Sequence, residues 1–176
     1  MATEQENTLA ALQTSIKMEI DGKEFYLKAS QQSNSDLGKK LLAQLASEED
    51  IHRQTFEKIY DAIRKKQDWP KTGLQLDGGI ALRTIFARAT EKLGADSKSA
   101  RTELDAVQTA IKMEVKTYDF YTSRSKAIAS GAEKEFYEAL AGQEREHQLV
   151  LLDYYEYLKD PASWFVKKEH PSIDGG

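Results

Sequence analysis

Cysteine is absent from the 176 residues of the sequence. This absence excludes disulfide bonds, thiolate nucleophiles, zinc ribbons and iron–sulfur clusters. Any metal ion must therefore be bound by oxygen and nitrogen ligands. Proline and glycine are also scarce, with 3 and 10 residues respectively. The long segments between them are rich in Ala, Leu, Glu, Lys and Gln, a composition that favours helices.

The sequence also lacks long apolar runs and an excess of positive charge. Its longest purely apolar runs, such as LVLL at residues 149–152, are far too short to cross a bilayer, and MATEQENTLA has no charged-then-apolar leader. The net charge of -4 and the pI near 5.5 argue against nucleic acid or an anionic membrane as partner. We therefore expect a soluble, cytoplasmic protein without either partner.

Helical periodicity predicts four long helices. We expect the first at about residues 8–30, with Leu12, Ile16 and Leu27 on its apolar stripe, and the second at about 36–66. The third begins near Ser99 and the fourth ends near Leu158. A crossover at about residues 67–98 joins the second to the third and contains a short amphipathic helix, IALRTIFARATEKL. We assign residues 1–160 to one bundle domain and residues 161–176 to a C-terminal tail with a short helix.

One phrase of the sequence occurs twice, 95 residues apart. QTSIKMEIDGKEFY begins at residue 13 and QTAIKMEVKTYDFY at residue 108, and the same shift superimposes LASEEDIH on LAGQEREH. A single offset therefore pairs the first predicted helix with the third and the second with the fourth. The acids and histidines that match under this offset are Glu19 with Glu114, Glu49 with Glu144, and His52 with His147.

The spacing of these residues favours a shared site. Residues three apart on a helix lie on one face, so the Glu and the His of each Glu-x-x-His motif can reach one point. In an antiparallel hairpin, residues equidistant from the turn lie at one level. The midpoint between Glu19 and His52 falls in the turn SNSD, and the midpoint between Glu114 and His147 falls in the turn ASG. All six side chains are therefore expected at one height of a four-helix bundle.

A metal site explains these six residues better than a bundle with buried hydrogen-bonded acids. Four carboxylates in one core would be costly unless they were protonated or paired, whereas two divalent cations cancel their charge. One Glu from each of two helices and a Glu-x-x-His pair from each of the other two form a carboxylate-bridged dinuclear site. Carboxylate and imidazole ligands suit iron, with manganese or a mixed metal pair as the alternative.

The six positions, the duplicated hairpins and the FY that follows each single Glu resemble the ferritin-like di-iron proteins, most closely the rubrerythrins. The resemblance extends over about residues 8–158. It implies an all-α ferritin-like four-helix bundle made of two duplicated hairpins and binding two iron ions. Its implied roles by position are terminal ligands for Glu19 and Glu114, bridging ligands for Glu49 and Glu144, and one iron each for His52 and His147.

Tyr26 and Tyr121 correspond to rubrerythrin tyrosines that hydrogen-bond ligand carboxylates, which makes them the candidate catalytic residues. The alternative is that they are core tyrosines with satisfied hydroxyl groups. The sequence also departs from the family. Many rubrerythrins carry a further glutamate one turn beyond the third-helix ligand, where this chain has Thr117, with Gly22 as its counterpart. Many also carry a cysteine-rich rubredoxin module, which a chain without cysteine cannot form.

The resemblance implies an oxidoreductase that reduces hydrogen peroxide or dioxygen at a dinuclear iron site. Its electrons would come from an external donor such as a rubredoxin-like protein, and related proteins are often homodimers. Two other functions remain open from the sequence. One is an iron-binding or storage protein whose centre is a ferroxidase site, and the other is a structural bundle stabilised by metal.

Overall fold

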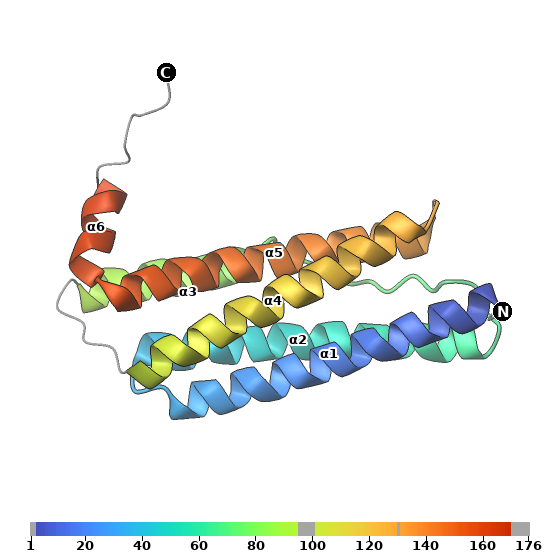
Figure 1. Cartoon of the computed structure of the whole chain (residues 1–176), viewed down its shortest axis with the longest axis horizontal. Coiled ribbons are helices and arrows are strands. Elements are labelled where there is room, and N and C mark those ends of the chain that lie inside the picture. Colours follow the sequence, from blue (N-terminus) through green and yellow to red (C-terminus); the bar gives the residue numbers. More distant parts are fainter. Residues whose placement is uncertain (1–2, 95–100, 130, 170–176) are drawn as a thin grey trace, which may run out of the picture.

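Two long helical hairpins and a crossover between them make up the computed structural model, which describes residues 3–94, 101–129 and 131–169 (Figure 1). The predicted all-α architecture is confirmed, including the short helix in the crossover. The predicted start of the third long helix near Ser99 lies outside the described residues. The helices are α1 (Glu4–Gln32), α2 (Asp36–Arg64), α3 (Ile80–Leu93), α4 (Arg101–Ala127), α5 (Ala132–Lys159) and α6 (Pro161–Glu169).

The first hairpin begins and turns at polar capping residues. Helix α1 starts before the predicted Thr8, because the Thr3 hydroxyl accepts the Glu6 N–H while the Glu6 carboxylate accepts the Thr3 N–H. This reciprocal pair satisfies two N–H groups at the helix start. Helix α2 starts at the predicted Asp36, and Ser35 accepts the N–H of Gly38 at 2.9 Å.

The buried face of α1 differs from the predicted apolar stripe. The prediction for Leu27 is wrong, because 41% of this residue is exposed. The true inner face carries polar and small residues between its apolar ones, so hydrophobicity alone does not identify it. Its buried members are Thr8, Leu12, Ser15, Glu19, Gly22, Tyr26 and Ala29.

The core consists of two apolar clusters with a polar layer between them. One cluster includes Leu41, Leu45 and Val150 and also contains buried residues of α3. The other includes Leu12 and Phe56, together with aromatic residues of α4 and α5. The predicted metal ligands lie at the level between the two clusters, so apolar packing on both sides fixes the height of these six side chains.

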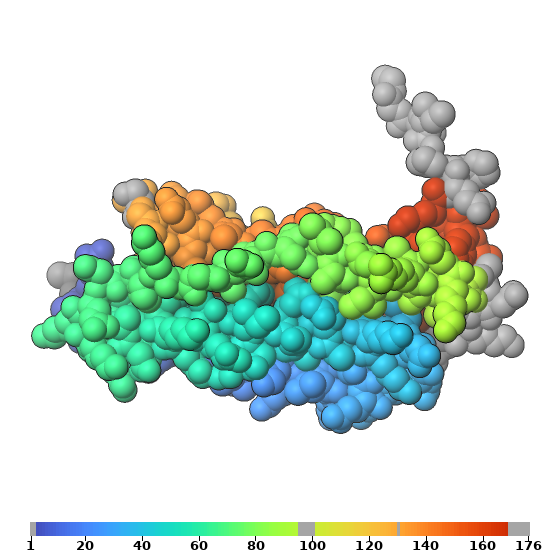
Figure 2. Space-filling view, turned by 180° about the vertical axis from the view of Figure 1, so that it is seen from behind, coloured from blue at the N-terminus to red at the C-terminus, as the bar shows by residue number. Residues whose placement is uncertain are grey.

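The crossover covers the face formed by α2 and α5. Figure 2 shows this segment, in green, lying along the molecule between α2 (cyan) and α5 (orange). Trp69, Leu74 and Leu76 pack against the second apolar cluster, whereas Leu82 and Phe86 of α3 are buried in the first. The crossover is therefore a packed cover over one face of the bundle.

Helix α6 is the predicted short helix of the C-terminal tail. Its Trp164 ring packs edge-on against Phe86 of α3, with ring centroids 5.4 Å apart, and against Tyr157 of α5, at 5.6 Å. These contacts attach α6 to the part of the first cluster that contains residues of α3. No helix in the described part of the chain has both the length and the apolar character that a bilayer span requires.

A second buried polar group holds the hairpins together away from the six predicted ligands. The Glu103 carboxylate of α4 accepts hydrogen bonds from Ser33 Oγ at 2.6 Å, from Ser35 Oγ at 3.2 Å and from the Tyr154 hydroxyl. Gly38 packs directly against this group, and a Cβ atom there would overlap oxygen atoms of three of its members. Glycine is required at this position by the close approach, since the residue lies within a helix.

Candidate metal centre

The structure brings all six predicted ligands to one place. Helices α1 and α4 each contribute one buried glutamate, and α2 and α5 each contribute a buried Glu-x-x-His pair. None of the six residues is more than 3% exposed. They are Glu19, Glu49, His52, Glu114, Glu144 and His147. The internal repeat and the hairpin geometry therefore identified a real cluster from sequence alone.

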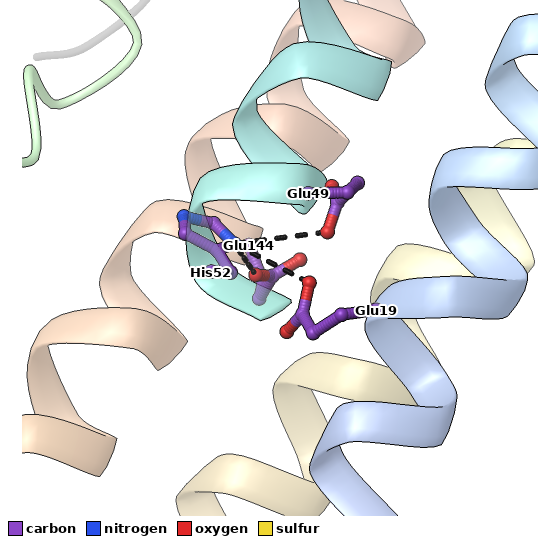
Figure 3. Close-up of side chains that lie close together, drawn as sticks. All are labelled: Glu19, Glu49, His52 and Glu144. Atoms are coloured by element: carbon purple, nitrogen blue, oxygen red, sulfur yellow. Dashed lines mark ion pairs between the residues drawn. The ribbon is translucent and has the colours of Figure 1, made fainter. Parts of the chain in front are cut away.

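His52 faces three of the acids through one ring nitrogen. Its Nδ1 atom lies 3.5 Å from Glu19 Oε2, 3.7 Å from Glu49 Oε2 and 3.3 Å from Glu144 Oε1. Figure 3 shows these three carboxylates around that nitrogen, while the other ring nitrogen points away from them. The acids come from α1, α2 and α5, so this position is made by three helices.

His147 occupies the corresponding position in the second hairpin. Its Nδ1 atom lies 3.1 Å from Glu49 Oε1, 3.6 Å from Glu114 Oε2 and 3.6 Å from Glu144 Oε2. The two imidazole rings lie nearly parallel, with centroids 5.9 Å apart. The arrangement around His52 is thus repeated, with Glu114 in the place of Glu19.

Two groups of four residues can each hold a metal ion, and they share two acids. The first is Glu19, Glu49, His52 and Glu144, and the second is Glu49, Glu114, Glu144 and His147. Within each group the potential ligand atoms lie within 4.8 Å of one another. Glu49 and Glu144 belong to both groups, whereas each remaining residue belongs to one. This is the pattern expected of two bridging and two terminal carboxylates.

The residues also fit a pair of cations because their inward-facing atoms have no other partner. Buried atoms without a hydrogen bond among the described residues include Glu19 Oε2, Glu49 Oε1, Glu144 Oε1 and the Nδ1 atoms of both histidines. Buried polar atoms are normally satisfied, so this concentration points to a missing partner. Divalent cations would satisfy all of these atoms, and a carboxylate–imidazole set suits iron or manganese.

Burial and mutual repulsion dominate the electrostatics of the terminal acids. Burial, followed by the negative charge of Glu49, raises the pKa of Glu19 well above its usual value. Burial and the charge of Glu144 raise the pKa of Glu114 in the same way. In the metal-free protein the buried site therefore disfavours ionisation of both terminal acids. A bound cation would favour their ionised forms.

The pKa values of the two histidines and of the shared acids are shifted toward the charged forms, unlike those of the terminal acids. Burial lowers the pKa of His52 and of His147, but the adjacent carboxylates, chiefly Glu19 and Glu114, raise both values well above normal. For Glu49, burial raises the pKa, but hydrogen bonding to Glu19 and His147 lowers it by more than burial raises it. The pKa of Glu49 therefore lies well below its usual value. Without metal, the carboxylates therefore favour the protonated imidazoles, while burial and mutual repulsion favour the neutral forms of the terminal acids.

The two predicted tyrosines contact ligand carboxylates, and each contact crosses between the hairpins. Tyr26 of α1 donates a hydrogen bond to Glu114 Oε1 of α4, and Tyr121 of α4 donates to Glu19 Oε1 of α1. Both phenols are buried, and burial together with the nearby carboxylates raises their pKa well above the usual 10.0. They therefore remain protonated donors that leave the second oxygen of each acid free to face the centre.

Glu48 is a residue of the site that the internal repeat did not select. Its Oε2 atom lies 2.9 Å from His147 Nε2 and accepts the amide of Gln143 at 2.8 Å. The offset comparison discarded it because its counterpart is Gln143 and not an acid. The pKa of Glu48 is raised by burial but lowered more strongly by His147 and two glutamines, so its carboxylate is ionised.

The positions where many rubrerythrins have a further glutamate contribute no carboxylate here. Gly22 packs against Glu49, since a Cβ atom at Gly22 would lie 3.5 Å from Glu49 Cγ. The Thr117 hydroxyl donates to the Met113 carbonyl of its own helix at 3.1 Å. The centre therefore has six candidate ligands, and neither Gly22 nor Thr117 offers a carboxylate that could replace one of them.

The fold and this cluster together define a ferritin-like helical bundle. Residues 10–100 match the family described as Rubrerythrin, and the chain belongs to this family. The match extends over α1, α2 and α3 and includes Glu19, Glu49 and His52. Neither the curated proteins nor the solved structures gave a match. The resemblance found in the sequence is thus confirmed at the level of the family and the fold.

Proposed function

We propose that this protein is a non-heme di-iron oxidoreductase that reduces hydrogen peroxide, or dioxygen, at the centre between the two hairpins. The observation that carries this proposal is the sharing of Glu49 and Glu144 by two four-residue groups. Sharing of this kind suits two adjacent metal ions and has no use in a single-ion site. When bound, a pair of ferrous ions supplies two electrons to a small oxidant.

The residues of the chain supply binding, orientation and exclusion of water. The four inward-facing carboxylates neutralise two divalent cations, so the six ligands and two cations together carry no net charge. Tyr26 and Tyr121 act as positioning residues, because each holds one oxygen of a terminal acid. Burial of the ligands below 4% exposure limits access to small molecules.

The partners follow from the chemistry of such a centre. Reduction of one hydrogen peroxide to two water molecules consumes two electrons and two protons. The chain has no cysteine with which to hold an iron–sulfur donor. We therefore propose an external one-electron donor, such as a rubredoxin-like protein. A homodimer also remains a prediction.

Metal counting combined with rapid kinetics tests this function. The protein is loaded anaerobically with ferrous iron, freed of excess metal and mixed with peroxide or dioxygen in a stopped-flow spectrometer. We expect about two irons per chain that peroxide oxidises rapidly, and little bound iron in the matched Glu49→Ala protein. One zinc per chain, or no iron after loading, would contradict the assignment.

The same iron count separates the proposed enzyme from a storage protein. Repeated ferrous additions should stop raising the iron content near two per chain, in a particle of small size by sedimentation. A ratio that climbs to tens of irons in a large assembly would instead establish storage. Bound iron that never reacts with either oxidant would establish a structural role.

A further inference from the structure

The two histidines of the centre differ in what lies behind them. Glu48 and Gln143 are counterparts under the 95-residue offset, and each directly precedes a shared acid. Glu48 approaches His147 of the opposite hairpin, with Oε2 2.9 Å from Nε2. The Gln143 side chain donates to the same Oε2 atom at 2.8 Å, and Gln44 donates to Oε1 at 2.9 Å. Both oxygens of this buried carboxylate are thus engaged.

These contacts fix the orientation of His147. With Nε2–H directed at a carboxylate, the ring presents to a cation its Nδ1 atom, which lies beside Glu114 and gives up its proton when the cation binds. A carboxylate behind an imidazole also raises its basicity as a ligand. The position at His147 therefore has a ligand that is held in place before a metal arrives.

Among the described residues, no carboxylate lies in the corresponding place behind His52, whose ion pairs all run through Nδ1. A cavity of about 160 Å³ borders His52, and its lining also includes Glu48, Gln143 and residues 75–77 of the crossover. The Oε1 atom of Gln143 is buried without a hydrogen-bond partner among the described residues. The outer side of the His52 ring therefore lacks the carboxylate partner that His147 has, and the cavity leaves space beside it.

The crossover covers the two sides of the α2/α5 face differently. On α5, Glu146 forms an ion pair with Arg83 of α3 and also packs against Gly79. Its counterpart on α2 is Ile51, which lines the cavity and is 49% exposed. The start of α3 therefore closes over α5, whereas the cavity beside His52 lies under the extended part of the crossover seen in Figure 2.

We infer, given the proposed di-iron function, that the two metal positions are unequal. Glu48 makes the position at His147 the tighter one, and the position at His52, beside the cavity, is the one that a small anionic or peroxide-like ligand reaches. Glu48 acts through His147 and is a positioning residue. Gln143 supports the same position, because its amide donates to Glu48 Oε2 and lies 3.4 Å from His147 Nε2.

Cobalt titration of the metal-free protein tests the first half of this inference. We expect wild-type protein to bind Co²⁺ in two steps, with the tight step lost in His147→Ala and retained in His52→Ala. The isosteric Glu48→Gln change should weaken the tight step by about 10- to 100-fold, the usual effect of removing an outer-shell partner. The weak step should not change.

The double exchange Glu48→Gln with Gln143→Glu is the matched control. It keeps one carboxylate and one amide at these positions, and it should restore part of the tight step at His147, because the end of the Gln143 side chain lies 3.4 Å from His147 Nε2. A further Glu48→Gln change in the His147→Ala background should have little effect, because the two residues act as a unit. Two equal steps in wild-type protein, or equal weakening of both steps by Glu48→Gln, would overturn the inference.

Azide binding to the cobalt-loaded protein tests the second half. Ile51→Trp places a large side chain at the cavity and should slow azide binding, followed through the visible spectrum of cobalt, by at least about tenfold. Leu149→Trp is the control, because Leu149 is 41% exposed on α5 and is not part of the cavity lining. Equal azide rates in the two variants would show that the ligand arrives elsewhere.

These measurements also separate failure of the inference from failure of the proposed function. A wild-type protein that binds fewer than two Co²⁺ ions contradicts the dinuclear function itself. Two ions bound with equal affinity, and insensitive to Glu48, leave that function in place and remove only the inequality of the two positions.

Discussion

The two hairpins have the same side chains toward the centre and different side chains behind it. Glu19 and Glu114 occupy equivalent places, as do the two Glu-x-x-His pairs. The difference begins one layer further out, where Glu48 faces Gln143. The requirement to neutralise and bridge two cations acts on the inner layer from both hairpins equally. The outer layer meets a crossover on one face of the bundle and has no reason to stay symmetric.

The two hairpins also differ in how they were recognised. The family match extends over residues 10–100 and so includes the ligands of the first hairpin alone. The ligands of the second hairpin were identified by the internal repeat and by the level at which they face the first. The structure places Glu114, Glu144 and His147 within the same cluster. The same substitution at matching positions of the two hairpins therefore tests whether their ligands bind metal in the same way.

The largest effect is expected from the shared acids. Glu49→Ala and Glu144→Ala should each abolish tight binding of both metal ions, because each acid belongs to both ligand groups. Glu19→Ala and Glu114→Ala should each weaken mainly one ion. Elemental analysis after dialysis against a weak chelator distinguishes the two patterns. Loss of both ions in Glu19→Ala as well would show that Glu19 also bridges.

The next largest expected effect is the change in the stability of the metal-free protein with pH, and the effect of bound metal on that change. The folded pKa values of Glu19 and Glu114 lie above the unfolded value of 4.5, and those of His52 and His147 lie above 6.5. The folded metal-free protein therefore binds more protons than the unfolded chain, and this contribution to stability is lost as pH rises through the folded values. Glu49 has a lowered pKa, so its contribution is already complete above pH 4.5.

Stability of the metal-free protein should consequently fall as pH rises above about 6.5. Bound metal replaces the protons, so the gain in stability from metal should grow over the same range. At a free metal concentration of 100 times Kd this gain is about 2.7 kcal/mol. Urea unfolding at several pH values, with and without metal, measures both curves. Parallel curves would mean that metal binding releases no protons.

The inner layer was predictable from sequence because its residues repeat under one offset. The turns SNSD and ASG fixed the level of Glu19 and Glu114 without any coordinates. The hydrogen bonds of Tyr26 and Tyr121 to ligand acids were also implied by the resemblance. That each tyrosine reaches the opposite hairpin was not, since the repeat alone does not say how the two hairpins are docked.

The outer layer was not predictable by the same reasoning. Glu48 is excluded by a comparison that keeps only matching residues, because its role depends on its difference from Gln143. Glu103 lies in an ordinary helical segment, and its hydroxyl donors come from a distant turn and from Tyr154 of α5. The pair Thr3 and Glu6 is a capping signal for the start of α1. The prediction used apolar periodicity alone and therefore placed that start too late.

A moderate effect is expected from the tyrosines. Tyr26→Phe and Tyr121→Phe each remove the donor to a buried carboxylate oxygen and should each destabilise the metal-free protein by about 1–3 kcal/mol. The two costs should be similar, because the contacts are reciprocal. Chemical denaturation of both variants measures them. A cost confined to Tyr121→Phe would show that the hairpins are unequal in the inner layer as well.

The last comparison is between a glycine from each hairpin, and it includes the smallest expected effect. Gly38→Ala should destabilise the protein by about 1–3 kcal/mol, because the added methyl group overlaps the oxygens around Glu103. Gly142→Ala meets nothing within 4 Å and should stabilise α5 by about 0.5–1 kcal/mol. Thermal unfolding of the two variants gives the opposite shifts. A stabilising Gly38→Ala change would mean that the Glu103 group can move aside.

The crossed tyrosine bonds give the centre a property that concerns covalent connection. Each hairpin contributes three of the six ligands, but the hydroxyl that holds its terminal acid belongs to the other hairpin. The centre thus depends on which helices meet and not on whether one peptide chain joins them. Two fragments divided within the crossover, or hairpins exchanged between two copies of the chain, would present the same six ligands and the same two donors. Metal binding at the centre would therefore show that two complementary hairpins have paired, whether they belong to one chain, to two fragments or to two copies of the chain.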